Sequence, residues 1–117
     1  MKILLVDDEK NFSDVLDSYL HFDHEVTVYN NSLNALEHYK KNQDYQVIIT
    51  DYLMPYLRGD ELIRDILKIN KKQQFIISSG YFSDRSLGVF EKEGQTCYVI
   101  KKPYDLDHMG VLLELLE

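Results

Sequence analysis

Hydrophobic residues in this chain gather in short runs separated by segments with helical spacing. Three of the runs, at residues 3–6, 47–49 and 75–77, are continuous and rich in β-branched side chains. Such runs are typical of strands covered on both faces, as in a parallel sheet. Two weaker runs, at residues 25–29 and 97–100, are short or alternate with polar residues, which favours positions at the sheet edges.

Between these runs, apolar residues recur every three or four positions, which predicts amphipathic helices. The clearest patterns cover residues 12–20 and 62–69, and shorter ones cover 33–39 and 106–116. A helix over residues 84–93 is the weakest prediction, because it has few apolar anchors and contains a glycine. The expected buried face of the first helix consists of Phe12, Val15, Leu16, Tyr19 and Leu20.

Five strands thus alternate with five helices, which predicts an α/β fold. Crossovers between neighbouring parallel strands are right-handed, so this alternation favours an open parallel sheet with helices on both faces. The length of 117 residues suits one compact domain, and we expect a single domain over residues 1–117.

Composition and charge narrow the function. The formal net charge of -7 argues against direct nucleic-acid binding, which depends on Lys and Arg to neutralise phosphates. No apolar run is long enough for a membrane span, and the first residues lack the pattern of a secretory signal. We therefore expect a cytoplasmic protein without membrane contact.

Polar residues close the predicted strands, and sites in open α/β sheets form at the carboxyl ends of strands. These residues are Asp7, Asp8, Asp51, Ser79 and Lys102. Three converging carboxylates would repel one another, which makes a divalent cation, and Mg²⁺ in particular, a natural companion. Mg²⁺ commonly binds phosphate oxygens as well, and an Asp carboxylate can act as a nucleophile in phosphoryl transfer.

Each of these residues also has an ordinary structural interpretation. Asp7 and Asp8 could favour the start of the next helix through its dipole, and Asp51 could be a polar strand end. Lys101 is as good a cation as Lys102 by charge alone. Only the joint occurrence of the residues favours a phosphoryl site.

Histidines offer a second candidate site. His21 and His24 are close in sequence, but no cysteine lies near them and the other two histidines are distant. A zinc site would need a fold contact that nothing in the sequence supports, so we interpret them as surface residues.

Four motifs together resemble the receiver domain of response regulators. They are Val-Asp-Asp at residues 6–8, Asp-Tyr-Leu-Met-Pro at 51–55 with Gly59 beyond, Ser-Gly at 79–80 and Lys-Pro at 102–103. Each is weak alone, but their order and spacing are jointly specific, and the resemblance runs along the whole chain. It implies a flavodoxin-like, doubly wound fold: a five-stranded parallel sheet in the order 2-1-3-4-5 with helices on both faces.

The resemblance also assigns roles around a Mg²⁺ ion. It implies that Asp51 is the phosphoacceptor and that Asp8 binds the metal directly. Asp7 would act largely through metal-bound water, and Leu53 would be a ligand through its backbone carbonyl.

The resemblance also implies which residues hold the phosphoryl group and what its transfer achieves. Ser79 resembles the switch hydroxyl and Lys102 the lysine that pairs with a phosphoryl oxygen. The implied function is that of a phosphoacceptor in a two-component system or phosphorelay. In that function, a sensor histidine kinase or histidine phosphotransfer protein donates the phosphoryl group to Asp51. The protein-binding face that then changes is formed by residues 84–93, the strand at Cys97 and the last helix. This face acts on a downstream protein target or effector domain.

Three positions depart from the family's usual pattern. An aromatic residue is usual three positions before the Lys of the Lys-Pro pair, but Val99 stands there, and Tyr98 should point to the opposite sheet face. Leu53 and Tyr81 flank the path of a hydrolytic water in this family. Their bulk predicts a long-lived phosphorylated state.

Two rival functions remain. A pseudo-receiver would keep the acidic pocket but act as a protein-interaction module without phosphorylation; the intact Asp51, Asp8 and Lys102 weigh against it. A phosphohydrolase with an Asp nucleophile would want a general acid two residues after Asp51, where Leu53 stands.

Overall fold

The computed structural model describes residues 1–79, 97–101 and 106–116. Within these ranges the elements are β1 (Lys2–Val6), α1 (Lys10–Leu20), β2 (Glu25–Tyr29), α2 (Ser32–Lys41), β3 (Val47–Asp51), α3 (Gly59–Ile69), β4 (Gln74–Ser79), β5 (Cys97–Lys101) and α5 (Leu106–Leu116). The helix predicted over residues 84–93 lies outside the described residues, as do Tyr81 and Lys102.

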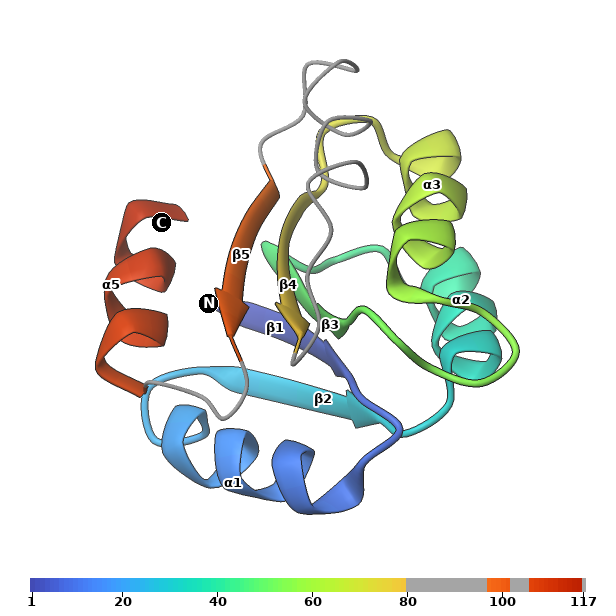
Figure 1. Cartoon of the computed structure of the whole chain (residues 1–117). Coiled ribbons are helices and arrows are strands. Elements are labelled where there is room, and N and C mark those ends of the chain that lie inside the picture. The colour runs from blue at the N-terminus through green and yellow to red at the C-terminus, as the bar shows by residue number, and fades with distance from the viewer. Residues whose placement is uncertain (80–96, 102–105, 117) are drawn as a thin grey trace.

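The five strands form one parallel sheet in the order β2-β1-β3-β4-β5, which confirms the predicted topology (Figure 1). The chain runs from β1 to β2 on one side and then crosses to β3 on the other side of β1. The strand order therefore reverses between β1 and β3, and a crevice at their carboxyl ends is the expected place for a site.

Helices cover both faces of the sheet, with α2 and α3 on one face and α1 and α5 on the other (Figure 1). Alternate residues of each central strand enter the two cores. In β1, for example, Leu4 and Val6 pack toward α2 and α3, whereas Ile3 and Leu5 pack toward α1 and α5. None of the described helices combines the length and apolar character that a membrane crossing requires.

The buried face of α1 differs from the prediction. Its buried residues are Ser13, Leu16 and Leu20, whereas Val15 is 55% exposed and Tyr19 is 40% exposed. The predicted Leu16 and Leu20 are buried and Phe12 is half-buried, so the buried stripe runs through positions 13, 16 and 20 at spacings of three and four residues. The sequence pattern thus located the helix and the centre of its buried face, but it included Val15 and Tyr19 and missed Ser13, which carries no hydrophobic signal.

The two neighbouring residues of β5 point to opposite faces, as predicted. Val99 packs against the core on the α2 and α3 side, and Tyr98 packs against the core on the α1 and α5 side. Strand alternation therefore prevents Tyr98 from standing in for an aromatic side chain at position 99.

Candidate functional site

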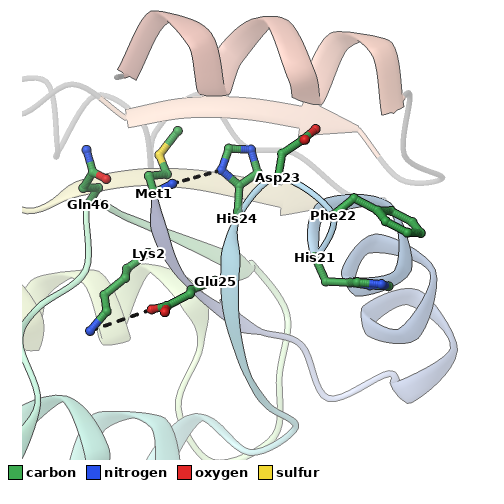
Figure 2. A pocket seen from close by; sticks show the side chains of 8 residues that line it. All are labelled: Met1, Lys2, His21, Phe22, Asp23, His24, Glu25 and Gln46. Carbon is green, nitrogen blue, oxygen red and sulfur yellow. Dashed lines mark hydrogen bonds and ion pairs between the residues drawn. The ribbon is translucent and has the colours of Figure 1, made fainter.

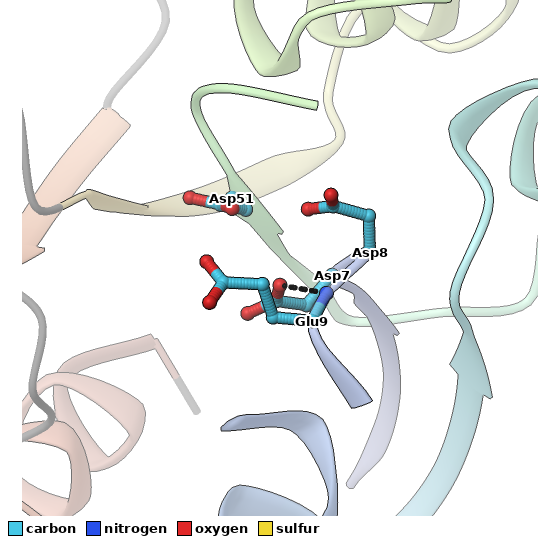
Figure 3. Close-up of side chains that lie close together, drawn as sticks. All are labelled: Asp7, Asp8, Glu9 and Asp51. Carbon is cyan, nitrogen blue, oxygen red and sulfur yellow. Dashed lines mark hydrogen bonds between the residues drawn. The ribbon is translucent and has the colours of Figure 1, made fainter. Parts of the chain in front are cut away.

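Four carboxylates meet at the carboxyl edge of the sheet, where the neighbouring strands β1 and β3 end (Figure 3). They belong to Asp7, Asp8, Glu9 and Asp51, and one oxygen from each lies within 4.8 Å of the others. Asp7 is fully buried and Asp51 is 4% exposed. Across the part of the chain that the structure describes, this is the one group of three or more such side chains that could hold a metal ion.

Backbone amides orient the two buried carboxylates. Asp7 follows β1 and remains tied to β2, because its N–H donates to the carbonyl of Tyr29 at 3.1 Å. Its Oδ1 accepts a hydrogen bond from the N–H of Glu9 at 2.9 Å. In the same way, Asp51 Oδ1 accepts from the N–H of Tyr52 at 2.9 Å. Each carboxylate is thus held by a backbone amide a short distance beyond the end of its strand.

Gly59 fixes the loop that follows Asp51. As the first residue of α3, it donates its N–H to the carbonyl of Tyr52 at 2.7 Å. A Cβ atom at this position would overlap the carbonyl oxygen of Asp51 and approach the Tyr52 Cα to 3.0 Å. The close approach of α3 to the end of β3 therefore requires glycine.

The donor set fits a divalent cation. Carboxylate oxygens are hard ligands, and oxygens around Mg²⁺ lie about 2 Å from the metal, so opposite ligands are about 4 Å apart. The mutual spacing within 4.8 Å suits such a shell. Four like charges, two of them on buried side chains, also favour a cation between them.

The other predicted site residues are placed in part. Ser79 is the last residue of β4 and pairs in register with Lys101, the last residue of β5. Both strands thus end at the same edge as Asp51, whose register partner is Ser78. Lys102 lies just beyond the described part of β5, and Leu53 lies in the turn after β3 with its side chain 53% exposed.

Glu9 was not among the predicted site residues. It is the N-cap of α1, but its side chain makes no capping hydrogen bond. Figure 3 shows its carboxylate beside those of Asp7 and Asp51. The available sequence signal was its position directly after Asp7 and Asp8. The motif covers only those two acidic residues, so it did not include Glu9.

A second hollow lies at the opposite, amino-terminal edge of the sheet, with a volume of about 440 Å³ (Figure 2). Its walls include both His21 and His24, with the two rings turned to different sides. His21 Nδ1 is 2.9 Å from the carbonyl oxygen of Asp17, and His24 Nδ1 is 3.3 Å from the amino group of Met1. No candidate metal-binding group among the described residues includes either histidine.

Comparisons with known proteins agree with this geometry. The family model for the response regulator receiver domain matches residues 3–114. The transcriptional regulatory protein CpxR homolog of Haemophilus influenzae is 33% identical over 106 residues, which cover 89% of this chain and 44% of that protein. This chain spans less than half the length of the curated relatives it matches.

Solved structures give the same result. A response regulator receiver domain protein from Clostridium thermocellum is 28% identical, with a TM-score of 0.88 over 98% of this chain and 92% of that one. The receiver domain of the Francisella response regulator 1452 is 27% identical, with a TM-score of 0.83 over 98% of this chain and 94% of that one.

Proposed function

Because the chain belongs to the response regulator receiver domain family, we propose that it accepts a phosphoryl group on Asp51 and switches a protein-binding face in response. Receiver domains are phosphoacceptor switches rather than classical enzymes. They interact with histidine kinases or phosphotransfer proteins and with effector domains. The cytoplasm is the proposed location.

The observation that carries the proposal is the position of Asp51, buried at the end of β3 and within reach of three further carboxylates. In the proposed reaction, a carboxylate oxygen of Asp51 attacks the phosphorus of a partner's phosphohistidine. The phosphorus–nitrogen bond breaks, its electron pair stays on the imidazole, and the imidazole takes a proton. The product is an acyl phosphate on Asp51.

Mg²⁺ is the proposed cofactor, and receiver domains generally bind it at an acidic pocket. Asp8 and Asp51 would hold it directly with the backbone carbonyl of Leu53, and Asp7 would act through metal-bound water. When bound, the ion neutralises charge on the carboxylates and the phosphoryl oxygens.

Two further residues would secure the phosphoryl group. Ser79 would donate its hydroxyl to one phosphoryl oxygen, and Lys102 would pair with another. The position of Ser79 at the end of β4, beside β3, supports its role. For Lys102, the support is the Lys-Pro motif and the place of Lys101 at the end of β5.

The proposed output face comprises residues 84–93, β5 and α5. Phosphoryl contacts at Ser79 and Lys102 would bias the arrangement of these segments. Val99 lacks the ring that the family commonly uses at this position, so we propose that transmission here depends on repacking of the core that Val99 joins.

Mass spectrometry with a small acyl-phosphate donor and Mg²⁺ tests the proposal. We expect wild type to gain the mass of one phosphoryl group and Asp51→Asn to gain nothing. Asp44→Asn, which alters an exposed carboxylate paired with Lys2 at the amino-terminal edge of the sheet, should react like wild type. Failure of wild type to react would favour a non-phosphorylated interaction module and overturn the proposal. Continuous turnover of the donor would instead indicate a phosphohydrolase.

A further inference from the structure

Three of the four clustered carboxylates come from the short connection between β1 and α1. Asp7, Asp8 and Glu9 are the only residues between the last residue of β1 and the first of α1. Like charges repel at this spacing, so the backbone of the connection has to be held by contacts outside it.

Asn30, the residue after β2, provides such contacts. Its Nδ2 donates to the carbonyl oxygen of Asp7 at 2.7 Å and to Oγ of Ser13 at 3.0 Å. A carbonyl oxygen can only accept, so the nitrogen of the Asn30 amide has to face Asp7. Both hydrogens of that nitrogen are thereby used.

The partner on the helix side is itself fixed. Ser13 is fully buried in the first turns of α1, and its hydroxyl donates to the carbonyl of Lys10 at 3.1 Å. One amide group therefore joins the peptide that leaves β1 to the helix that begins after Glu9. The two ends of the acidic connection are held by the same side chain.

From these contacts we propose that Asn30 is a positioning residue for the metal site, one that fixes the Asp7–Asp8 peptide and the start of α1 so that their carboxylates converge. The Asp7 carbonyl belongs to the peptide that leads into Asp8, so a rotation of this peptide swings the Asp8 carboxylate. The tie to Ser13 sets the first turn of α1 and with it the position of Glu9. This inference rests on the proposed Mg²⁺ site and adds a residue outside the family motifs.

Calorimetric titration with Mg²⁺ in the absence of any phosphoryl donor tests the inference directly. We expect Asn30→Ala to bind Mg²⁺ roughly three- to tenfold more weakly than wild type, the range that corresponds to losing one net intramolecular hydrogen bond. Asn34→Ala is the matched control, since it removes the same side chain from an exposed position on α2. It should bind like wild type.

A double-mutant cycle separates positioning from general loss of stability. Ser13→Ala should weaken Mg²⁺ binding in the wild-type background and have less effect in the Asn30→Ala background, because the two residues act through one bridge. At saturating Mg²⁺ the rate of Asp51 phosphorylation in Asn30→Ala should return close to that of wild type. A merely structural defect would persist.

Two results would count against the inference, and they differ in scope. Equal Mg²⁺ affinity of wild type and Asn30→Ala would overturn the role of Asn30 and leave the proposed function intact. Absence of Mg²⁺ binding by wild type would overturn both.

Discussion

Glu9 occupies the N-cap position of α1, but its side chain does not cap the helix. An N-cap residue ordinarily accepts a hydrogen bond from the first turn of its helix. Glu9 makes no such bond and instead brings its carboxylate to the acidic cluster. The first turn of α1 therefore lacks this capping acceptor, and the acidic cluster has a fourth carboxylate.

We predict that Glu9→Gln weakens Mg²⁺ binding several-fold. Removal of one negative charge about 4 Å from a divalent ion loses roughly 2–8 kcal/mol of attraction before screening, and the exposed position of Glu9 together with salt brings the loss to the lower end or below it. Calorimetric titration at low ionic strength measures the effect. Glu114→Gln, an exposed change on α5, serves as the control, and identical affinities of all three proteins would contradict the prediction.

Leu53 leads to a prediction about phosphoryl lifetime. Its side chain is bulky and lies two residues after Asp51, where the family resemblance puts the path of the hydrolytic water. We expect Leu53→Asn to dephosphorylate faster than wild type, because a smaller polar side chain admits and orients water. Loss of the phosphoryl mass with time, after removal of the donor, gives the rate. Rapid loss in wild type that is unchanged in Leu53→Asn would refute the idea.

The site residues that could be predicted from the sequence are those that belong to a recognisable motif. Asp7, Asp8 and Asp51 close predicted strands, and strand ends meet at one edge of a parallel sheet. Asn30 carries no such signal, because its bonds to Asp7 and Ser13 join positions 23 and 17 residues apart. The contact with Ser13 depends on the burial of that residue, which its polar side chain does not signal in the sequence.

At the scale of elements, a buried hydrogen bond joins α2 to the start of β4. The hydroxyl of Tyr39 donates to Oε1 of Gln73 at 2.6 Å, and it accepts from Nδ2 of Asn70 at 3.4 Å. Tyr39 is fully buried and Gln73 is 3% exposed. The bond therefore ties the helix layer to the sheet in a place that water does not reach.

We predict that Tyr39→Phe lowers the free energy of unfolding by about 1–3 kcal/mol at neutral pH, because the Gln73 oxygen keeps its buried position and loses a donor. Urea unfolding measures this change. Tyr45→Phe is a comparison variant, since Tyr45 is only half-buried. An unchanged stability of Tyr39→Phe would show that the bond contributes nothing net.

Tyr39 also makes the stability of the fold depend on pH. Burial raises the pKa of the Tyr39 phenol above its ordinary value, and the hydrogen bond from Asn70 only partly opposes this shift. The folded state then holds this proton at a pH where the unfolded chain has lost it, so stability falls as pH rises above about 10. Unfolding experiments across this range should show a shallower decline in Tyr39→Phe than in wild type.

At the scale of the whole molecule, the sheet order could be predicted because the alternation of strands and helices allows few arrangements. The two-sided burial of β1, β3 and β4 follows from their continuous apolar runs. The buried face of α1 was predictable only in part: Leu16 and Leu20 are buried as expected, but the buried Ser13 looks polar in sequence and the exposed Val15 and Tyr19 look like core residues.

Mg²⁺ should stabilise the entire fold. The four carboxylates converge only when β1 and β3 are paired, so a bound ion would favour the folded state over the unfolded chain. At a concentration one hundred times its dissociation constant it would add about 2.7 kcal/mol. Thermal unfolding should shift upward with Mg²⁺, more than with NaCl of equal ionic strength, and less in Asp51→Asn. Equal shifts with both salts would indicate general screening of the net charge.

The contact between Gly59 and the backbone of Asp51 also limits which amino acids evolution can place at position 59. Every other amino acid carries a Cβ, and the space that it would need is occupied by main-chain atoms rather than by a side chain that could move aside. Even a conservative replacement is therefore excluded, because the Cβ of alanine would meet the same main-chain atoms as the Cβ of tryptophan. In a saturation library selected for signalling, position 59 should retain glycine alone, whereas the neighbouring exposed Arg58 should tolerate several replacements.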